Sequence, residues 1–118
     1  MPLQFGRLTG KFDRGAAFPE NDHRKNRLTA EVVNASSTAL APVWELCEKY
    51  NCTKTQLALS YVLSYSEVSV IIPGIRTREH VTGNTTGLFQ LDIADKEMIE
   101  ALGISDFTSV MELIRLQG

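Results

Sequence analysis

The sequence predicts a mostly α-helical chain with one or two short strands. From residue 36 onward, apolar residues recur every three or four positions, which is the spacing of one buried face of a helix. One short run near residue 70 departs from this period, because it is rich in β-branched residues and ends at Pro-Gly, as a buried strand typically does. The first 35 residues are rich in glycine, proline and charged residues, and we expect them to be irregular.

The length and composition of the chain fit one globular domain. It has 118 residues, of which 43% are hydrophobic, and a formal net charge of -2. A packed core is therefore feasible, and general disorder is not expected. We treat residues 1–35 as an irregular segment and residues 36–118 as a helical segment of the same single domain.

The charge pattern argues against nucleic-acid and membrane partners. Basic residues are scattered, and their one cluster, residues 23–27 (HRKNR), contains no interleaved aromatic residue, so we expect a solvated loop. No apolar stretch reaches the roughly 20 residues that span a bilayer. The N-terminus lacks the pattern of a signal peptide. We therefore expect a soluble, cytoplasmic protein.

The first helix is predicted from an apolar face near residue 45. This face consists of Leu40, Val43, Trp44, Cys47 and Tyr50. Pro42 fits best in a first helical turn, where its missing N–H costs nothing, whereas in a helix interior it produces a kink. The helix therefore either begins near Ala41 or is kinked there. A separate short helical turn is expected near residues 30–33.

A second helix is predicted over residues 54–64. Thr53 and Gln56 have the spacing of a capping box. Its apolar face consists of Leu57, Ala58, Tyr61 and Val62. The chain has two cysteines, Cys47 and Cys52, without the spacing of a metal site, so we expect free thiols, with a disulfide as the alternative.

The predicted strand covers residues 68–72 (VSVII). Thr77 is a suitable N-cap for a helix over residues 78–86, which Gly83 weakens. An apolar strand buried without neighbours would leave its backbone N–H and C=O groups unpaired. The neighbours must therefore come from another chain or from a part of the protein that this chain lacks.

The turn after this strand has the physical features of an anion site. Gly74 lets a ligand approach the backbone, and Arg76 can bind a phosphate with two hydrogen bonds. Thr77 starts a helix whose free N–H groups favour an anion. On the pattern alone, an ordinary strand–turn–helix connection remains the favoured interpretation.

Two more helices complete the prediction. Residues 91–104 form the first, with Asp95 and Glu97 in its opening turn, where the helix dipole favours acidic side chains. Residues 106–116 form a terminal amphipathic helix, which we expect to cover apolar surface on this chain or on a second copy. Their apolar residues are Ile93, Met98, Ile99 and Leu102 in the first, and Phe107, Val110, Met111 and Ile114 in the second.

Three stretches in the same order carry a resemblance to a known family. They are PLQFGRLTGKF near the N-terminus, TKTQLALSYVLS in the middle, and SVIIPGIRTREHV after it. Together they resemble the C-terminal part of the aldo-keto reductases, from about Pro2 to Leu102, and FPENDHR resembles a loop of the bacterial members. The family fold is a (β/α)8 barrel. The resemblance implies a partial barrel, in which residues 68–72 are strand eight and the helices around it are the C-terminal helices.

The resemblance also implies that the chain holds part of an NADP(H) site. The residues that match cofactor-binding positions are Gly6, Leu8, Thr9, Gly74, Arg76, Thr77, His80 and Asn84. The first three match a loop that closes over the pyrophosphate. Gly74 and Arg76 match positions near the adenosine 2′-phosphate, and the last two residues match positions near the adenine. His80 departs from the family, which usually has Gln there, and Gly83 replaces a residue that is often acidic.

The catalytic residues of the family have no counterpart in this chain. The family's Asp, Tyr, Lys and His come from early strands, and no stretch here matches those motifs. Tyr50, Tyr61 and Tyr65 lie in or beside helical patterns, so we interpret them as packing residues. We expect no catalytic residue and no metal site.

Two functions are therefore considered. In the first, the chain is the C-terminal, cofactor-binding portion of an NADPH-dependent reductase of aldehydes or ketones, and lacks catalysis by itself. In the second, it is a non-catalytic helical module that oligomerises through its exposed strand. The partner is correspondingly a second copy of the chain or the missing barrel portion, which a separate chain could supply.

Overall fold

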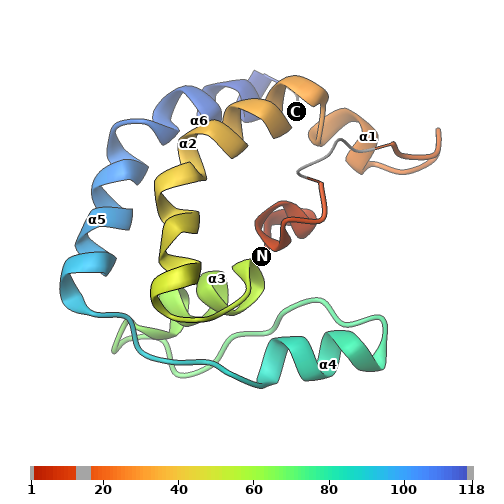
Figure 1. Ribbon diagram of the computed structural model, residues 1–118. Coiled ribbons are helices and arrows are strands. Elements are labelled where there is room, and N and C mark those ends of the chain that lie inside the picture. Colours follow the sequence, from red (N-terminus) through yellow and green to blue (C-terminus); the bar gives the residue numbers. More distant parts are fainter. Residues whose placement is uncertain (1, 13–16, 117–118) are drawn as a thin grey trace.

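The N-terminal segment lies inside an arc of helices in the computed structural model, which describes residues 2–12 and 17–116 (Figure 1). The elements in these ranges are η1 (Gln4–Thr9, a 3-10 helix), α1 (Arg24–Arg27), α2 (Ala30–Lys49), α3 (Lys54–Leu63), α4 (Arg78–Thr85), α5 (Ile93–Ile104) and α6 (Phe107–Leu116). Helix α2 contacts α3, α5 and α6, while α3 also contacts η1 and α4. The predicted mostly helical class is confirmed.

Helix α2 begins 11 residues earlier than the first of the two predicted alternatives. Thr29 caps it, because its Oγ1 accepts the Val32 N–H at 3.4 Å. Pro42 lies inside the helix, and Figure 1 shows α2 changing direction about midway along its length. A start near Ala41 is therefore wrong, and the second alternative, a kink at the proline, describes the helix.

A Schellman motif ends α2. Asn51 has a positive φ of 47°, its N–H donates to Glu48 O at 3.2 Å, and the Cys52 N–H donates to Cys47 O at 3.0 Å. This geometry brings the Cys47 and Cys52 thiols into hydrogen-bond contact. Both thiols are free, as predicted. Burial and the neighbouring Cys47 thiol raise the pKa of Cys52 to about 11, so the pair is unreactive near neutral pH.

Helix α3 is the most enclosed element. The predicted capping box is present, with the Gln56 N–H at 3.2 Å from Thr53 Oγ1 and the Thr53 N–H at 2.9 Å from Gln56 Oε1. Leu57 is buried, as expected, but Leu59 and Ser60 are buried as well. The predicted single apolar face was incomplete, because α3 contacts η1, α2 and α4 rather than one neighbour.

An extended segment, residues 88–92, lies along α3. The Phe89 N–H donates to Ser60 Oγ at 3.1 Å, and the Leu91 N–H donates to Ser64 Oγ at 2.9 Å. Ser60 and Ser64 are four residues apart, so they lie on one face of the helix. Phe89 and Leu91 enter the main core cluster, which forms around Val43, Leu46, Leu57 and Leu91. Two serine hydroxyls thus replace the sheet neighbour that such a segment would otherwise need.

The strand predicted over residues 68–72 is not formed among the described residues. Residues 68–76 have no regular secondary structure, and the side chains of Val70 and Ile72 are 72% and 84% exposed. Among the described residues, residues 68–72 make one backbone hydrogen bond, which runs from the Val68 N–H to Tyr65 O at 3.0 Å. A strand requires a neighbour to pair its backbone groups, and no described segment supplies one.

The basic cluster is also corrected. Residues 24–27 form α1 rather than a loop. Arg24 pairs with Asp22 through three side-chain hydrogen bonds, and Lys25 pairs with Glu20. Arg24 and Lys25 are therefore neutralised locally, whereas Arg27 of the same cluster is exposed.

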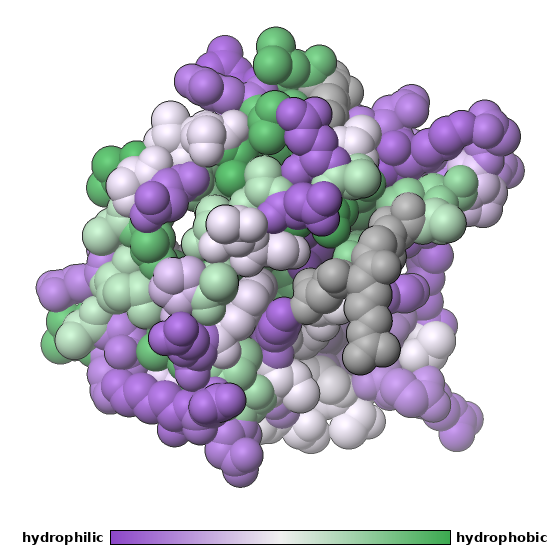
Figure 2. All heavy atoms as spheres, turned by 45° about the horizontal axis from the view of Figure 1, so that its top comes forward, coloured by the Kyte–Doolittle hydropathy of each residue, from purple (hydrophilic) through white to green (hydrophobic). Residues whose placement is uncertain are grey.

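A second core cluster joins the N-terminal segment to α2. It contains Phe12, Leu28 and Val33, with Phe5 and Phe18 packed against it. Figure 2 brings the α2–α6 side of the molecule forward and shows hydrophobic residues in small patches among hydrophilic ones. No helix in the described ranges is both long enough and apolar enough to cross a membrane.

Candidate functional site

The predicted cofactor residues form two groups. Gly6, Leu8 and Thr9 lie in η1, and the other five residues lie in or just before α4. Both η1 and α4 contact α3. No hydrogen bond or ion pair joins the two groups within the described ranges. The structure therefore places both groups against one helix without bringing their side chains together.

The η1 group is a tightly wound loop. Gly6 has a φ of 91°, and a Cβ at this position would lie 3.3 Å from Phe12 Cε2. Both the left-handed φ and this close approach favour glycine. The Thr9 hydroxyl donates to Gly6 O at 2.6 Å and accepts the Lys11 N–H at 3.3 Å. Leu8 is half-buried. The loop is thus held by its own hydrogen bonds.

The α4 group is a turn braced by its own helix. The Arg76 N–H donates to His80 Nδ1 at 3.2 Å, and Thr77 Oγ1 accepts the His80 N–H at 3.3 Å. Asn84 is buried, and its Nδ2 lies 3.4 Å from Gly74 O. A Cβ at Gly74 would meet no atom within 4 Å, so the turn is open to a ligand. His80 and Asn84 therefore have structural roles here, beside any contact with an adenine.

The start of α4 carries charged side chains of both signs, with Arg76 and Arg78 exposed beside Glu79. The first turn of α4 already contains Glu79, whose pKa is lowered by its own backbone N–H and by the Thr77 hydroxyl. A carboxylate thus occupies the favourable end of the helix dipole. Arg76 is exposed, and its guanidinium forms no ion pair with any described residue. An anion at this turn would be bound chiefly by arginine side chains.

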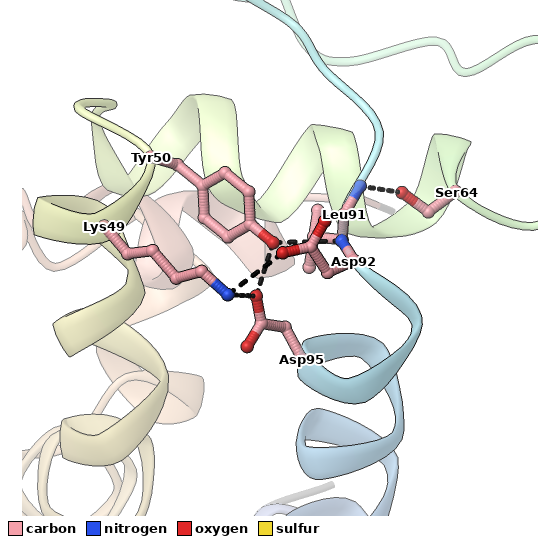
Figure 3. Close-up of polar contacts among 6 residues, drawn as sticks. All are labelled: Lys49, Tyr50, Ser64, Leu91, Asp92 and Asp95. Carbon is pink, nitrogen blue, oxygen red and sulfur yellow. Dashed lines mark hydrogen bonds and ion pairs between the residues drawn. The ribbon is translucent and has the colours of Figure 1, made fainter.

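A polar cluster that the sequence did not predict joins α2 to α5. Lys49 Nζ lies 2.6 Å from Asp95 Oδ2 and 3.1 Å from Asp92 Oδ2. The Tyr50 hydroxyl donates to Asp95 Oδ2 and accepts the Asp92 N–H at 2.9 Å. Figure 3 shows these groups facing one another from the two helices, with the Ser64–Leu91 contact beside them. A basic residue at the end of one helix and an acidic residue at the start of another suit both dipoles.

Tyr50 and Tyr61 pack against the main core cluster, as predicted, and the hydroxyls of all three tyrosines form hydrogen bonds. Burial raises the pKa of Tyr50, and the hydrogen bond to Asp95 raises it further. Burial also raises the pKa of Tyr65, which bonds Glu100 Oε1 at 2.5 Å and Tyr61 Oη at 2.8 Å. A tyrosine that donates a proton near neutral pH needs a pKa close to the working pH. The pKa values of Tyr50 and Tyr65 are instead raised further above neutral pH.

Replacing Asp95 with Asn is expected to reduce the acid sensitivity of the fold. Hydrogen bonds from Lys49 and Tyr50 lower the pKa of Asp95 below its unfolded value of about 3.9. Its stabilising contribution is therefore present above about pH 4 and is lost as the pH falls through the folded pKa. In urea unfolding, the difference in unfolding free energy between wild type and Asp95→Asn should be larger at pH 7 than at pH 3.

Glu97→Gln is the matched control for that experiment, because it removes an exposed carboxylate from the same helix. Its stability should follow that of wild type at both pH values. If the unfolding free energy of Asp95→Asn fell by as much as that of wild type between pH 7 and pH 3, Asp95 would not be the source of the acid sensitivity.

Arg7 is a candidate that the sequence reasoning missed. It is 9% exposed, and its Nε has no hydrogen-bond partner. Its guanidinium lies 5.9 Å from the centre of the Phe107 ring. No local signal predicts this burial, because it depends on α6, which is 100 residues away in the sequence. No group of acidic, cysteine and histidine side chains in the described ranges could hold a metal ion.

Comparisons with known proteins give a consistent result. A sequence model described as the aldo/keto reductase family matches residues 1–104. The chain is 32% identical over 108 residues to an NADH-specific methylglyoxal reductase of Escherichia coli (strain K12), which covers 86% of this chain and 32% of that protein. It is 25% identical over 99 residues to aldo-keto reductase str7 of Strobilurus tenacellus, which covers 82% of this chain and 29% of that protein. The chain spans about a third of the length of these relatives. No solved structure gives a significant match.

Proposed function

Because the chain belongs to the aldo/keto reductase family, we propose that it is the C-terminal, cofactor-binding portion of a nicotinamide-dependent carbonyl reductase. The supporting observation is the exposed, unpaired Arg76 guanidinium at an open glycine turn that α4 braces. The complete enzyme would transfer a hydride from the nicotinamide to an aldehyde or ketone. The chain's own residues would bind and orient the cofactor.

The two groups of predicted residues would contact different parts of the dinucleotide. The loop at Gly6, Leu8 and Thr9 would close over the pyrophosphate. Arg76 would bind the 2′-phosphate that distinguishes NADPH from NADH, since a guanidinium matches a phosphate with two parallel hydrogen bonds. His80 and Asn84 would lie beside the adenine. In this proposal Asn84 also holds the Gly74 turn in place.

The preference for NADPH over NADH is the most testable part of the proposal, because one relative is named NADH-specific. We expect the chain to bind NADPH more tightly than NADH, and Arg76→Gln to weaken NADPH binding about tenfold or more with little effect on NADH. The loss of one charge-assisted bidentate contact, worth roughly 1.5–3 kcal/mol, gives this factor. Fluorescence titration of both nucleotides measures it.

Arg115→Gln is the control, because it removes an arginine from the exposed side of α6. It should leave both affinities unchanged. Equal binding of NADPH and NADH by wild type would reject the assignment of Arg76. The absence of binding by either nucleotide would reject cofactor binding by this chain alone.

The chain by itself is proposed to lack catalysis. No stretch matches the family's catalytic motifs, and Tyr50 and Tyr65 are weakened as acids rather than activated. Turnover of a simple aldehyde with NADPH by the purified chain would contradict this point without affecting the binding proposal.

A second candidate is a helical module that oligomerises through residues 68–72. The exposed side chains of Val70 and Ile72, beside backbone N–H groups that bond no described residue, favour it. In the first proposal the same segment is strand eight of a barrel whose other strands lie outside this chain. Light scattering distinguishes the two, because a module predicts a stable oligomer without nucleotide binding, whereas a barrel portion predicts pairing only with the missing strands.

A further inference from the structure

Arg7 is a buried cation that has no anionic partner among the described residues. It is 9% exposed, its Nε bonds no group, and no described carboxylate forms an ion pair with it. Burial lowers the pKa of the guanidinium. A buried charge is costly unless it is paired and hydrogen-bonded. Within the described chain, the compensating charge is missing.

A small cavity lies beside Arg7. Its volume is about 60 Å³, and its walls are Gln4, Phe5, Arg7, Arg27, Leu28 and Ile114. A water molecule needs about 10–15 Å³ of such volume, so the cavity has room for about four to six oxygen-sized groups, which is enough for one phosphate. None of the described wall residues is acidic.

A second guanidinium reaches the same cavity from another element. Arg27 ends α1, is exposed, and lies 5.3 Å from the centre of the Phe5 ring. Stacking on an aromatic ring limits the positions that the guanidinium can adopt. The buried Arg7 from η1 and the solvent-facing Arg27 therefore line one space, and the apolar Leu28 and Ile114 complete it.

We propose that this cavity binds one phosphate-sized oxyanion between Arg7 and Arg27. A guanidinium has five N–H donors in a planar fork that suits a phosphoryl group. The anion would accept N–H donors of the two guanidinium groups and neutralise the buried Arg7 charge. Because the wall comes from η1, α1, Leu28 and α6, a bound anion would also tie the two ends of the chain together.

The anion is either free inorganic phosphate or a phosphoryl group of a larger ligand such as a dinucleotide. None of the six wall residues is among the eight cofactor positions carried over from the family. The inference therefore does not depend on the proposed function. In sequence, Arg7 lies between Gly6 and Leu8, which were both assigned to the pyrophosphate loop. A phosphoryl group of a dinucleotide would therefore lie near Arg7.

Thermal unfolding in sodium phosphate and in sodium chloride of equal ionic strength tests the proposal. Phosphate should raise the midpoint in a saturable manner beyond the effect of chloride, because a ligand that binds only the folded state stabilises it. At 100 times its Kd, the unfolding equilibrium constant should fall about 100-fold. Equal midpoints in the two salts at all concentrations would overturn the inference.

Two variants locate the effect. Arg7→Leu should remove the phosphate dependence, since an apolar side chain suits the surroundings of Phe107 and Ile114 and removes the donor. Arg27→Gln should weaken phosphate binding at least tenfold in calorimetric titration. Lys96→Gln removes one positive charge from α5, outside the cavity wall, and should retain the wild-type response. Phosphate binding that survives both arginine substitutions would overturn the proposal.

The design also covers a variant that fails to fold. Arg27 is exposed, so Arg27→Gln should fold and can test the site by itself if Arg7→Leu does not. If NADP⁺ competes with phosphate and Arg27→Gln abolishes that competition, the bound group is a phosphoryl group of a dinucleotide. If NADP⁺ does not compete, the site binds free phosphate or a different phosphate. A phosphate response that Arg27→Gln removes, together with equal binding of NADPH and NADH, would overturn only the cofactor proposal. Tighter binding of NADPH than of NADH, without any specific phosphate response, would overturn only this one.

Discussion

Replacing Leu57 with Ala is expected to lower the unfolding free energy of the chain by about 2–5 kcal/mol. Leu57 is 1% exposed and lies at the centre of the main core cluster, where it meets Val43, Leu46 and Leu91 from α2 and from the extended segment. Its removal leaves a cavity that three separate elements would have to fill. Urea unfolding followed by circular dichroism measures the change.

Two controls make this expectation specific. Leu116→Ala makes the same chemical change at a side chain that is 83% exposed, and should shift the unfolding free energy by less than about 0.5 kcal/mol. Leu57→Met conserves volume and should cost less than about 1.5 kcal/mol. A Leu57→Ala loss below about 1 kcal/mol would mean that this cluster is not the core of the chain.

Replacing Ser60 with Ala is expected to cost about 1–3 kcal/mol, although the change in volume is small. Ser60 is completely buried, and its Oγ accepts the Phe89 N–H at 3.1 Å. The variant leaves that N–H without a partner beside α3, where water has little access. The extended segment should therefore loosen, and amide hydrogen exchange at Phe89 should accelerate more than in α2.

Neighbouring serines provide the comparison. Ser64→Ala removes the acceptor of the Leu91 N–H, and because both hydroxyls hold one segment, the double variant should be non-additive. Ser66→Ala changes an exposed serine just after α3 and should be neutral. Unchanged exchange at Phe89 in Ser60→Ala would show that the hydroxyl does not hold the segment.

The helices that sequence predicted well are those whose signals are local. The Thr53–Gln56 capping box and the Thr77 cap join residues three positions apart, and such contacts form within one helix. The first half of α2 was predicted only as a separate short turn near residues 30–33, because Pro42 favoured a later helix start. Burial of Val32 and Val33, and packing against α6, stabilise the longer helix.

The candidate site was predictable only in part. Gly6 has the left-handed φ and the close contact that justify a glycine, and Arg76 lies exposed at the predicted turn. The engagement of Asn84 with Gly74, and of His80 with the Arg76 N–H, depends on how the turn folds back on α4. Side-chain type gives the donors and acceptors available at a position, but not which partner they find.

The sequence by itself determined the helical class, most of the helix ends, the free thiols and the family, because these follow from local spacing, caps and short motifs. Tertiary structure decided that residues 68–72 have no strand neighbour in the described chain, that Ser60 and Ser64 anchor residues 88–92, and that Arg7 is buried against α6. Each of these depends on groups far apart in the sequence. Whether a backbone group is paired, or a charge buried, depends on which segments pack beside it, and no local sequence pattern encodes those segments.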